Sequence, residues 1–171
     1  MLGALARVAS LFDAAGVPYA VIGAHAVNAW IEPRLTADID VTAQISSADL
    51  ARLQDQLAAA RFTLTRAEGV ELPSGPDFLR FASGDGTVVV EIQAAKTDLQ
   101  RAVIARAIRA EDGVRVATAE DLIVLKLIAN RPKDQVDLQG LVALPSLDWG
   151  YIERWAAEWE VFELLHRLRG R

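Results

Sequence analysis

The sequence lacks cysteine, long apolar runs and an excess of basic residues. Without cysteine, the chain can form neither a disulfide framework nor a thiolate site. No apolar run approaches the roughly 20 residues that a membrane-spanning helix needs, and residues 1–13 lack the layout of a signal peptide. We therefore expect a cytoplasmic protein that makes no contact with a membrane.

The charge balance is acidic, because 18 basic and 23 acidic residues give a net charge of −5 at pH 7. A protein that binds nucleic acid over a broad surface carries a basic face, which displaces counterions from the phosphates. The overall charge therefore argues against such a surface, although a local basic pocket for a nucleotide or for one end of an RNA is compatible with it. Residues 166–171 form a dense basic cluster, which we interpret as the solvated end of a helix.

The pattern of apolar residues predicts an α+β protein. The length of 171 residues and the hydrophobic content of 52% suit one domain with an ample core. Helical periodicity with its start and stop signals predicts helices at 2–15, 24–31, 46 or 47 to 60, 98–109, 119–130, 133–144, 149–159 and 161–169. Short β-branched and aromatic runs predict strands at 17–22, 35–43, 62–66, 78–82, 87–94 and 114–116, with residues 83–86 as a hairpin turn.

The order of these elements predicts two parts. Residues 1–117 would form a core with a small mixed β-sheet and flanking helices. Residues 118–171 would form a helical C-terminal part, which we expect to pack on the core as a single unit with it.

Two aspartates, Asp38 and Asp40, lie in an otherwise apolar strand. Residues two apart in a strand face the same side, so both carboxylates converge while Ile39 and Val41 face the other way. Two such carboxylates repel each other unless a cation or a proton lies between them, and a divalent metal is the commonest resident of an oxygen-rich site. The alternative is a pair of solvent-exposed carboxylates, which is unfavourable beside apolar neighbours.

Glu91 interrupts the β-branched run of residues 87–92. As a third carboxylate on a neighbouring strand, it would complete a two-metal site, in which the ions hold the attacking and leaving oxygens of a displacement. It could also act as general base for the attacking hydroxyl. The structural alternative is an edge-strand glutamate that faces solvent.

Gly23 ends a strand and opens a short helix, an arrangement that lets backbone N–H groups approach a phosphate. His25 lies in the first turn of that helix and could reach the same phosphate. An ordinary tight turn explains Gly23 and Ala24 equally well, and a histidine packed within a small helix is the more frequent arrangement.

Lys126 has apolar neighbours on almost every face of its helix. A lysine is rarely buried without a partner, so its ammonium must reach solvent, pair with a carboxylate or point into a cavity, where a triphosphate would satisfy it. Lys133, Asp134 and Asp137 gather at the start of the next helix. The two aspartates either stabilise that helix through its macrodipole, or one of them orients Lys126 or contacts a nucleotide.

Two motifs resemble a known enzyme superfamily. Gly23-Ala24 followed by Arg34-x-Thr36-x-Asp38-Ile39-Asp40 is similar to the opening motif of the nucleotidyltransferase (polymerase-β-like) superfamily. The later series Glu120-Asp121, Lys126 and Arg131-x-Lys133-Asp134-x-x-Asp137-Leu138 resembles one branch of it. That branch comprises the AbiEii-type toxins and related minimal nucleotidyltransferases of type IV toxin–antitoxin systems.

The resemblance implies the nucleotidyltransferase fold, a divalent metal (Mg²⁺ or Mn²⁺) and transfer of a nucleotidyl group from a nucleoside triphosphate such as ATP. The acceptor would be RNA, such as transfer RNA, or a protein, and an antitoxin protein would be a partner. Together with the residue patterns above, it predicts a metal site of Asp38, Asp40 and Glu91. The expected catalytic residues are Asp38, Asp40, Glu91, Lys126 and Asp134, and the expected nucleotide-binding residues are Gly23, Ala24, His25, Arg34, Thr36, Lys126 and Lys133.

Two other functions suit the same residues. A non-enzymatic nucleotide-binding or interaction module would bind nucleotide without turnover and hold a partner on the aromatic helices of residues 149–169, although core packing is the plainer reading of those tryptophans. A small-molecule (antibiotic-like) nucleotidyltransferase would share the metal site and differ only in its acceptor. The acidic net charge favours a small acceptor over a large RNA.

Overall fold

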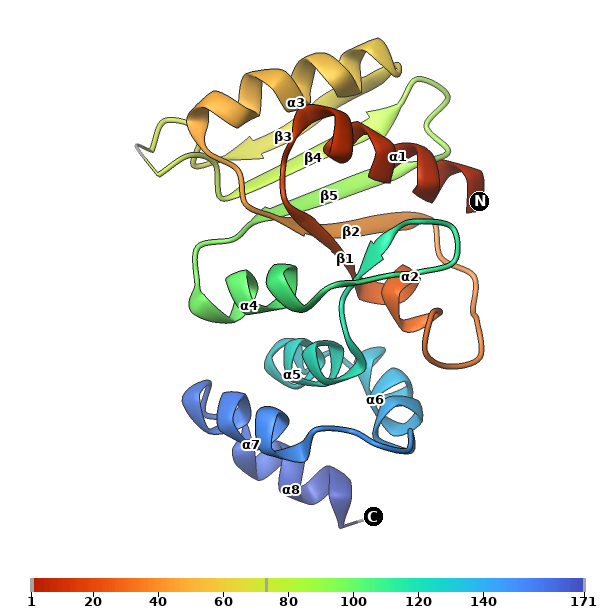
Figure 1. Ribbon diagram of the computed structural model, residues 1–171, viewed down its shortest axis with the longest axis vertical. Helices are drawn as coiled ribbons and strands as arrows, with labels where there is room; N and C mark the ends of the chain where they lie inside the picture. The colour runs from red at the N-terminus through yellow and green to blue at the C-terminus, as the bar shows by residue number, and fades with distance from the viewer. Residues whose placement is uncertain (1, 73, 171) are drawn as a thin grey trace.

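The computed structural model describes residues 2–72 and 74–170 (Figure 1). The helices of these residues are α1 (Leu2–Ala15), α2 (Gly23–Val27), α3 (Ser47–Ala59), α4 (Asp98–Arg106), α5 (Ala119–Ala129), α6 (Asp134–Val142), α7 (Trp149–Glu158) and α8 (Phe162–Arg169). The strands are β1 (Tyr19–Ile22), β2 (Asp38–Ala43), β3 (Phe62–Glu68), β4 (Phe78–Ser83), β5 (Val89–Ala94), β6 (Ile108–Arg109) and β7 (Arg115–Val116). Arg171, part of the expected basic cluster, lies outside the described residues.

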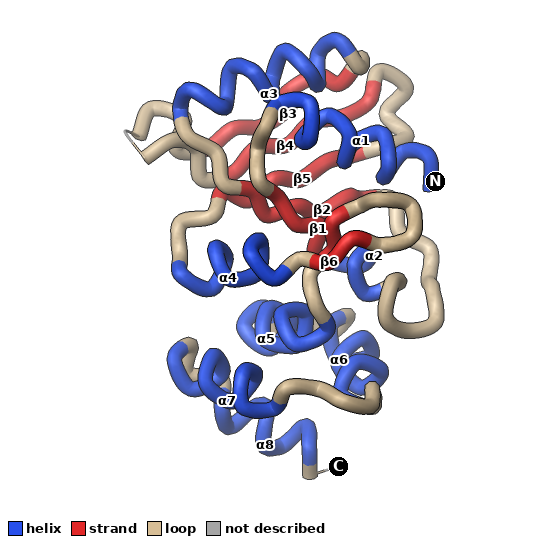
Figure 2. Tube along the Cα trace, viewed as in Figure 1, coloured by secondary structure: helices blue, strands red, loops and turns tan. Residues whose placement is uncertain are grey.

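The strands within the described residues form one seven-stranded mixed sheet in the order β3-β4-β5-β2-β1-β7-β6 (Figure 2). The central strand, β2, runs parallel to β5 and antiparallel to β1. The meander β3–β4–β5 extends the sheet on one side, and the short pair β7–β6 extends it on the other, with β7 parallel to β1. The expected α+β fold with a mixed sheet is confirmed.

Alternation along β2 separates an apolar face of the sheet from a polar one. Ile39 and Val41 are buried, and so are Val90 and Ile92, their register partners on β5. Figure 1 shows α1 and α3 along this apolar face. The opposite face carries the aspartates of β2, and α4 contacts β1 and β2 there. The carboxylates expected at the site thus lie on the face that the C-terminal helices approach.

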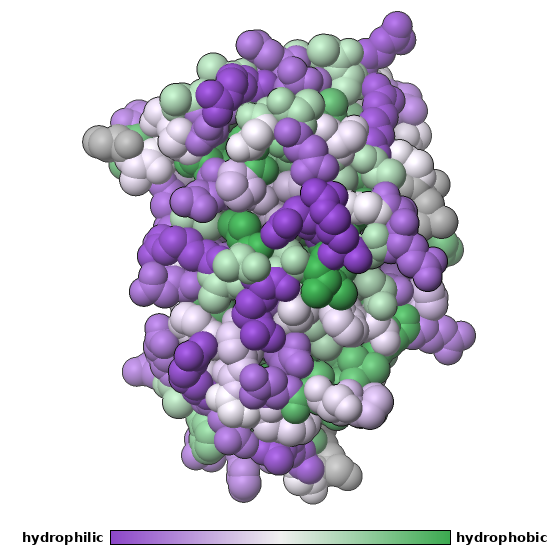
Figure 3. Space-filling view, viewed as in Figure 1, coloured by the Kyte–Doolittle hydropathy of each residue, from purple (hydrophilic) through white to green (hydrophobic). Residues whose placement is uncertain are grey.

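The C-terminal helices α5 to α8 gather at one end of the molecule, with α4 between them and the sheet (Figure 1). Buried apolar residues from Leu5 to Leu165 form one continuous core, so both expected parts contribute to it. The division of the chain at residue 117 stays a prediction. No described helix is long and apolar enough to cross a bilayer, and hydrophilic side chains cover much of the face in Figure 3, between small apolar patches.

Side-chain caps begin two of the helices. The Ser46 hydroxyl accepts a hydrogen bond from the Asp49 backbone N–H, and the Asp49 carboxylate accepts one from the Ser46 N–H, which completes a capping box for α3. The Thr118 hydroxyl accepts a hydrogen bond from the Asp121 N–H at the start of α5. Hydrogen bonds of these side chains therefore fix where α3 and α5 begin.

Three expected boundaries were wrong by a few residues. The helix expected at 98–109 ends at Arg106, because Ala107 has an extended backbone and Ile108 pairs with Val116 in the short strand pair β6–β7. The helix expected at 24–31 is only the five-residue α2, and the strand expected from residue 35 begins at Asp38. At Arg106, the pairing of Ile108 with Val116 overrides the local helical preference of the chain.

Candidate active site

The β2 strand brings Asp38 and Asp40 to the same face of the sheet. Asp38 is exposed and Asp40 is partly buried, while Ile39 between them is only 1% exposed. The alternation arises because Ile39 and Val41 anchor the strand in the core. The two carboxylates therefore stand above the sheet on a strand that the core holds in register.

Glu91 is the register partner of Asp40 across the parallel β2–β5 pair. The pKa of Asp40 is raised to about 6, mainly by burial and further by the negative charges of Glu91 and Asp38. The positive charges of Lys133 and Arg131 act in the opposite direction. The site therefore concentrates negative charge around Asp40, with two cations close enough to influence it.

Gly23 lies against Asp40 at the point where β1 becomes α2. Its φ angle of +65° is in the left-handed region, and a Cβ built on it would lie 2.0 Å from the Oδ2 atom of Asp40. A residue with a side chain would therefore be strained and would also collide with the carboxylate. The missing side chain of Gly23 therefore leaves room for Asp40, and contact of Gly23 with a nucleotide stays a prediction.

A preformed three-ligand metal centre is not found among the described residues. Glu91 is instead paired with Arg80 of β4, with 3.6 Å between Oε1 and Nε. Mg²⁺, however, commonly uses only one or two carboxylates and completes its octahedron with water and substrate phosphates. Asp38 and Asp40 supply such hard oxygen donors, so they fit the metal that the fold implies. The role of Glu91 as a further ligand stays a prediction.

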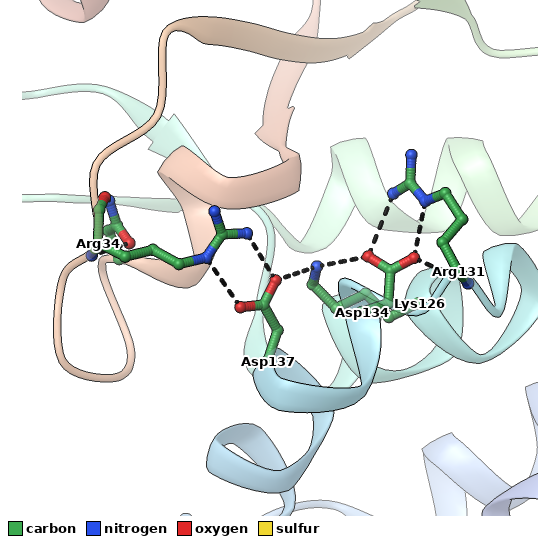
Figure 4. A network of polar contacts seen from close by, with 6 residues as sticks. Arg34, Lys126, Arg131, Asp134 and Asp137 are labelled. Atoms are coloured by element: carbon green, nitrogen blue, oxygen red, sulfur yellow. Dashed lines mark hydrogen bonds and ion pairs between the residues drawn. The ribbon is translucent and has the colours of Figure 1, made fainter.

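A chain of alternating charges connects the loop before β2 with helices α5 and α6 (Figure 4). Asp137 accepts two hydrogen bonds from the Arg34 guanidinium, at 3.0 and 2.9 Å, and one from Lys126 Nζ at 2.6 Å. Lys126 Nζ also donates to Asp134 at 3.1 Å, and Asp134 accepts from the Arg131 guanidinium at 2.7 and 3.2 Å. We call these five residues the ion-pair network.

The inner members of the ion-pair network are buried. The side chains of Asp134 and Asp137 are 1% and 2% exposed, and that of Lys126 is 6% exposed. Burial raises the pKa of both aspartates, but the hydrogen bonds and charges of their cationic partners outweigh it and lower the pKa below the usual range. Both aspartates are thus held ionised, and the ammonium of Lys126 has the carboxylate partners that one of its expected arrangements requires.

The ion-pair network changes how three expected site residues are interpreted. Both carboxylate oxygens of Asp134 accept hydrogen bonds within the ion-pair network, so Asp134 orients Lys126 and Arg131 in this arrangement. The guanidinium of Arg34 is likewise committed to Asp137. A direct catalytic role for Asp134, and contacts of Arg34 and Lys126 with a nucleotide, stay predictions.

Other expected nucleotide-binding residues lie around the same turn. Ala24 is buried and His25 is half-buried, and burial lowers the pKa of His25. Thr36 is half-buried in the loop that enters β2, and the exposed Lys133 immediately precedes α6. The positive charge of Lys133 lowers the pKa of Asp40. Contacts of Lys133, Ala24, His25 and Thr36 with a nucleotide stay predictions.

A hollow of about 290 Å³ begins at Gly23 and Asp40 and continues between α4 and α5. We call it the α4–α5 hollow. Lys126 and Arg131 line it, together with Thr97 and Gln100 at the start of α4 and Trp159 at the end of α7. It joins three of the expected site residues with residues from both parts of the chain.

The sequence patterns did not identify Arg131, Gln100 or Trp159 as site residues. Arg131 had a local signal, since it lies three residues before Asp134 and pairs with it. Gln100 and Trp159 had none, because the parallel pairing of β2 with β5 and the packing of α7 on α5 bring them to the site.

Comparison with known proteins decides the family. The family model described as "Nucleotidyl transferase AbiEii toxin, Type IV TA system" matches residues 7–167. The chain belongs to the AbiEii nucleotidyltransferase family. Membership makes it a nucleotidyltransferase, so the expected superfamily, branch and enzyme class are confirmed. No curated protein matches the chain.

Solved structures share the fold at low identity. An antigenic nucleotidyltransferase-like protein from Paracoccidioides brasiliensis has a TM-score of 0.58 at 16% identity, over 98% of this chain and 91% of that one. ANT(2″)-Ia in complex with adenylyl-2″-tobramycin has a TM-score of 0.54 at 16% identity, over 99% and 98%. Lincomycin-bound LnuA, a lincosamide antibiotic adenylyltransferase, has a TM-score of 0.55 at 12% identity, over 78% and 91%. At these identities, the similarity concerns the AbiEii fold alone.

Proposed function

We propose that the protein transfers a nucleoside monophosphate from a nucleoside triphosphate to an acceptor hydroxyl, with the help of Mg²⁺ or Mn²⁺. The observation that carries this proposal is the contact of Asp40 with Gly23, whose missing side chain leaves room for the carboxylate. Without a cation, the Asp40 carboxylate would repel a phosphate bound at the strand-to-helix turn of Gly23. A divalent metal ion between the carboxylate and the phosphate would remove this repulsion, as in metal-assisted phosphoryl chemistry.

Asp38 and Asp40 would hold the metal, whose charge would neutralise the triphosphate and stabilise the departing pyrophosphate. The raised pKa of Asp40 supports this assignment, because burial and the charges of Glu91 and Asp38 make an unaccompanied carboxylate unfavourable there. A divalent cation relieves that repulsion.

The reaction has one bond formed and one broken. The acceptor oxygen attacks the α-phosphorus, the bond between that phosphorus and the oxygen bridging to the β-phosphate breaks, and pyrophosphate leaves. The acceptor proton moves to the carboxylate of Glu91, which acts as general base beside Asp40. Arg80, the register partner of Glu91 on β4, pairs with that carboxylate at 3.6 Å and would help to orient it.

Lys126, Arg131 and Lys133 would contact the triphosphate. An ammonium has three hydrogens, and two of those of Lys126 go to Asp134 and Asp137, which leaves one for a phosphate oxygen. Lys126 and Arg131 also line the α4–α5 hollow that begins at Asp40. These three cations therefore supply local positive charge near Asp40, despite the acidic overall charge.

For the acceptor, we propose an RNA such as transfer RNA, and for the biological role, a toxin that acts with an antitoxin protein. Family membership supports the role. A small-molecule acceptor is the second candidate, supported by the fold shared with ANT(2″)-Ia in complex with adenylyl-2″-tobramycin and with lincomycin-bound LnuA, and by the net charge of −5.

The test mixes purified protein with Mg²⁺, total RNA and each α-³²P-labelled nucleoside triphosphate in turn. The matched control is the variant Asp38→Ala/Asp40→Ala. We expect label in RNA with the intact protein alone, and the productive triphosphate identifies the donor. Label on the protein instead points to self-modification or a protein acceptor, and an inactive nucleotide-binding module would bind the triphosphate without transferring label to RNA, protein or added aminoglycoside and lincosamide acceptors.

A further inference from the structure

The α4–α5 hollow extends well beyond the carboxylates. Asp40 is paired with Glu91, and two residues farther along the parallel strands Thr42 is paired with Gln93, which lines the hollow. Two strand residues span about 7 Å, and Thr97 and Gln100 follow after the end of β5. The hollow therefore runs along the strand direction, from the expected phosphate end at Gly23 and Asp40 toward the start of α4.

One wall of the hollow is apolar and aromatic. Leu122, Leu125 and Ile128 present the side of α5, and Trp159 adds an indole ring from the end of α7. The volume of about 290 Å³ lies near the lower limit of ligand pockets. Such a space suits a compact planar group better than an extended acceptor molecule.

The other wall carries an amide with a fixed orientation. Gln100 Oε1 accepts hydrogen bonds from the backbone N–H groups of Lys96 and Thr97, at 2.8 and 3.0 Å. Two donors on one oxygen determine which end of the amide is oxygen, so the NH₂ group of Gln100 is left to donate. The hollow thus combines an aromatic surface, an apolar wall and an N–H donor.

We propose that the far part of the α4–α5 hollow holds the nucleobase of the triphosphate. Trp159 stacks on the base, and the Gln100 amide donates to a ring nitrogen or carbonyl oxygen of it. This inference rests on the proposed function, because it assumes that the triphosphate group lies at Gly23 and Asp40. It makes Trp159, from the C-terminal part, a binding residue for the substrate of the core.

The test compares the binding of nucleoside triphosphates with that of inorganic tripolyphosphate, which has no base, in the presence of Mg²⁺ by calorimetry. Loss of a stacking side chain weakens binding about 5- to 150-fold. We expect a loss of this size for nucleoside triphosphates with Trp159→Ala, a much smaller one with Trp159→Phe, and unchanged tripolyphosphate affinity in both. Trp149→Ala is the matched control, because Trp149 lies on the same helix under Arg169 and away from the hollow.

Gln100→Glu gives a second readout that preserves the fold. Glutamate at this position keeps the acceptor oxygen of the capping box with Thr97 but replaces the N–H donor with a second acceptor. We expect the order of affinity among the four nucleoside triphosphates to change, in favour of bases that offer an amino group. An unchanged order overturns the role of Gln100.

The outcomes separate this inference from the proposed function. Equal losses for nucleoside triphosphates and tripolyphosphate with Trp159→Ala, or no loss for either, overturn the base site while the transferase stands. If Trp159→Ala does not fold, Gln100→Glu decides the matter, because an unchanged order of affinity among the four nucleoside triphosphates then overturns the base site. Wild-type protein that binds neither compound contradicts the proposed function itself.

Discussion

Arg34 and Asp137 are 103 residues apart in the chain and form a two-pronged ion pair, with N–O distances of 3.0 and 2.9 Å. Asn28 holds the backbone of Arg34 as well, donating to its carbonyl oxygen at 2.8 Å and accepting from its N–H at 3.0 Å. The loop that leads into Asp38 is therefore fixed at Arg34 by both backbone and side chain. The pair joins the carboxylate strand to helix α6.

Breaking this pair should affect catalytic positioning more than nucleotide binding. Arg34→Lys cannot reproduce the two-pronged contact, so we expect kcat to fall about 10-fold or more while KM for the nucleoside triphosphate changes little. The stability loss should be about 1–2 kcal/mol in urea unfolding, since Arg34 is 44% exposed. A large rise in KM with unchanged kcat would instead support direct nucleotide binding by Arg34.

Hydrogen exchange provides a second readout for the same pair. Asp137→Asn should increase exchange at residues 35–38, because the loop loses its anchor on α6. The control is Glu153→Gln, which breaks the exposed pair of Glu153 with Arg169, where both side chains are more than 40% exposed. We expect that variant to leave exchange at residues 35–38 unchanged and its free energy of unfolding within about 0.5 kcal/mol of wild type.

Local patterns predicted most of the fold and part of the site. The expected elements rest on apolar periodicity and on caps such as Ser46 and Thr118, which act within one helical turn. The convergence of Asp38 and Asp40 follows from strand alternation alone. The boundary error at Arg106 arose because Ile108 pairs with Val116, a contact that no local pattern encodes.

The partners of the site residues were not predictable from sequence. The apolar surroundings of Lys126 required a buried partner, but the sequence left solvent, carboxylate and cavity as alternatives. The choice depends on how α6 folds back on α5 and brings Asp137 within 2.6 Å of the ammonium. Trp159 and Gln100 reach the hollow through long-range packing. They line the same hollow as Asp40 in the folded structure, although they are far from it in the sequence.

Removing the central cation of the ion-pair network should destabilise the protein strongly. Lys126→Met leaves Asp134 and Asp137 buried with one partner fewer each, and breaking a buried ion pair in this way costs about 3–5 kcal/mol. Urea unfolding measures the loss. Adding Asp134→Asn and Asp137→Asn should recover part of it, because no buried charge then lacks a counter-charge.

The matched control for Lys126→Met is Arg52→Met. Arg52 pairs with Asp49 on the surface of α3, and its side chain is 60% exposed. We expect a change within about 0.5 kcal/mol. Similar losses of unfolding free energy for the two variants would show that the buried ion-pair network contributes no more to stability than a surface pair.

Gly23→Ala should abolish transfer by displacing Asp40. The added Cβ would meet Asp40 Oδ2 at 2.0 Å, and a shift of about 1 Å in a catalytic group can cost about 100-fold in rate. Gly86→Ala is the matched control, because Gly86 has a similar φ of +70° and no atom within 4 Å of the added Cβ. Both variants should lose about 1 kcal/mol from the left-handed backbone, and only Gly23→Ala should lose activity. Full activity of Gly23→Ala would contradict the site.

Asp40→Asn should abolish transfer and yet stabilise the metal-free protein at neutral pH. The folded-state pKa of Asp40, about 6, lies above its unfolded value near 4, so protonated Asp40 contributes stability that is present below pH 4 and is lost as the pH rises to 6. Asparagine has no such dependence. The stability advantage of Asp40→Asn should therefore be absent at pH 4 and reach about 1–2 kcal/mol by pH 7, a value reduced for partial solvent access.

Thermal unfolding with chelator from pH 4 to 8 measures this difference, and added Mg²⁺ provides the functional control. The ion should stabilise wild-type protein at pH 7 and Asp40→Asn much less, because binding to the folded state alone raises stability by mass action. A stability difference that does not change with pH would mean that Asp40 titrates normally, and the crowding of its carboxylate by Glu91 and Asp38 would then not be the reason for a cation at this site.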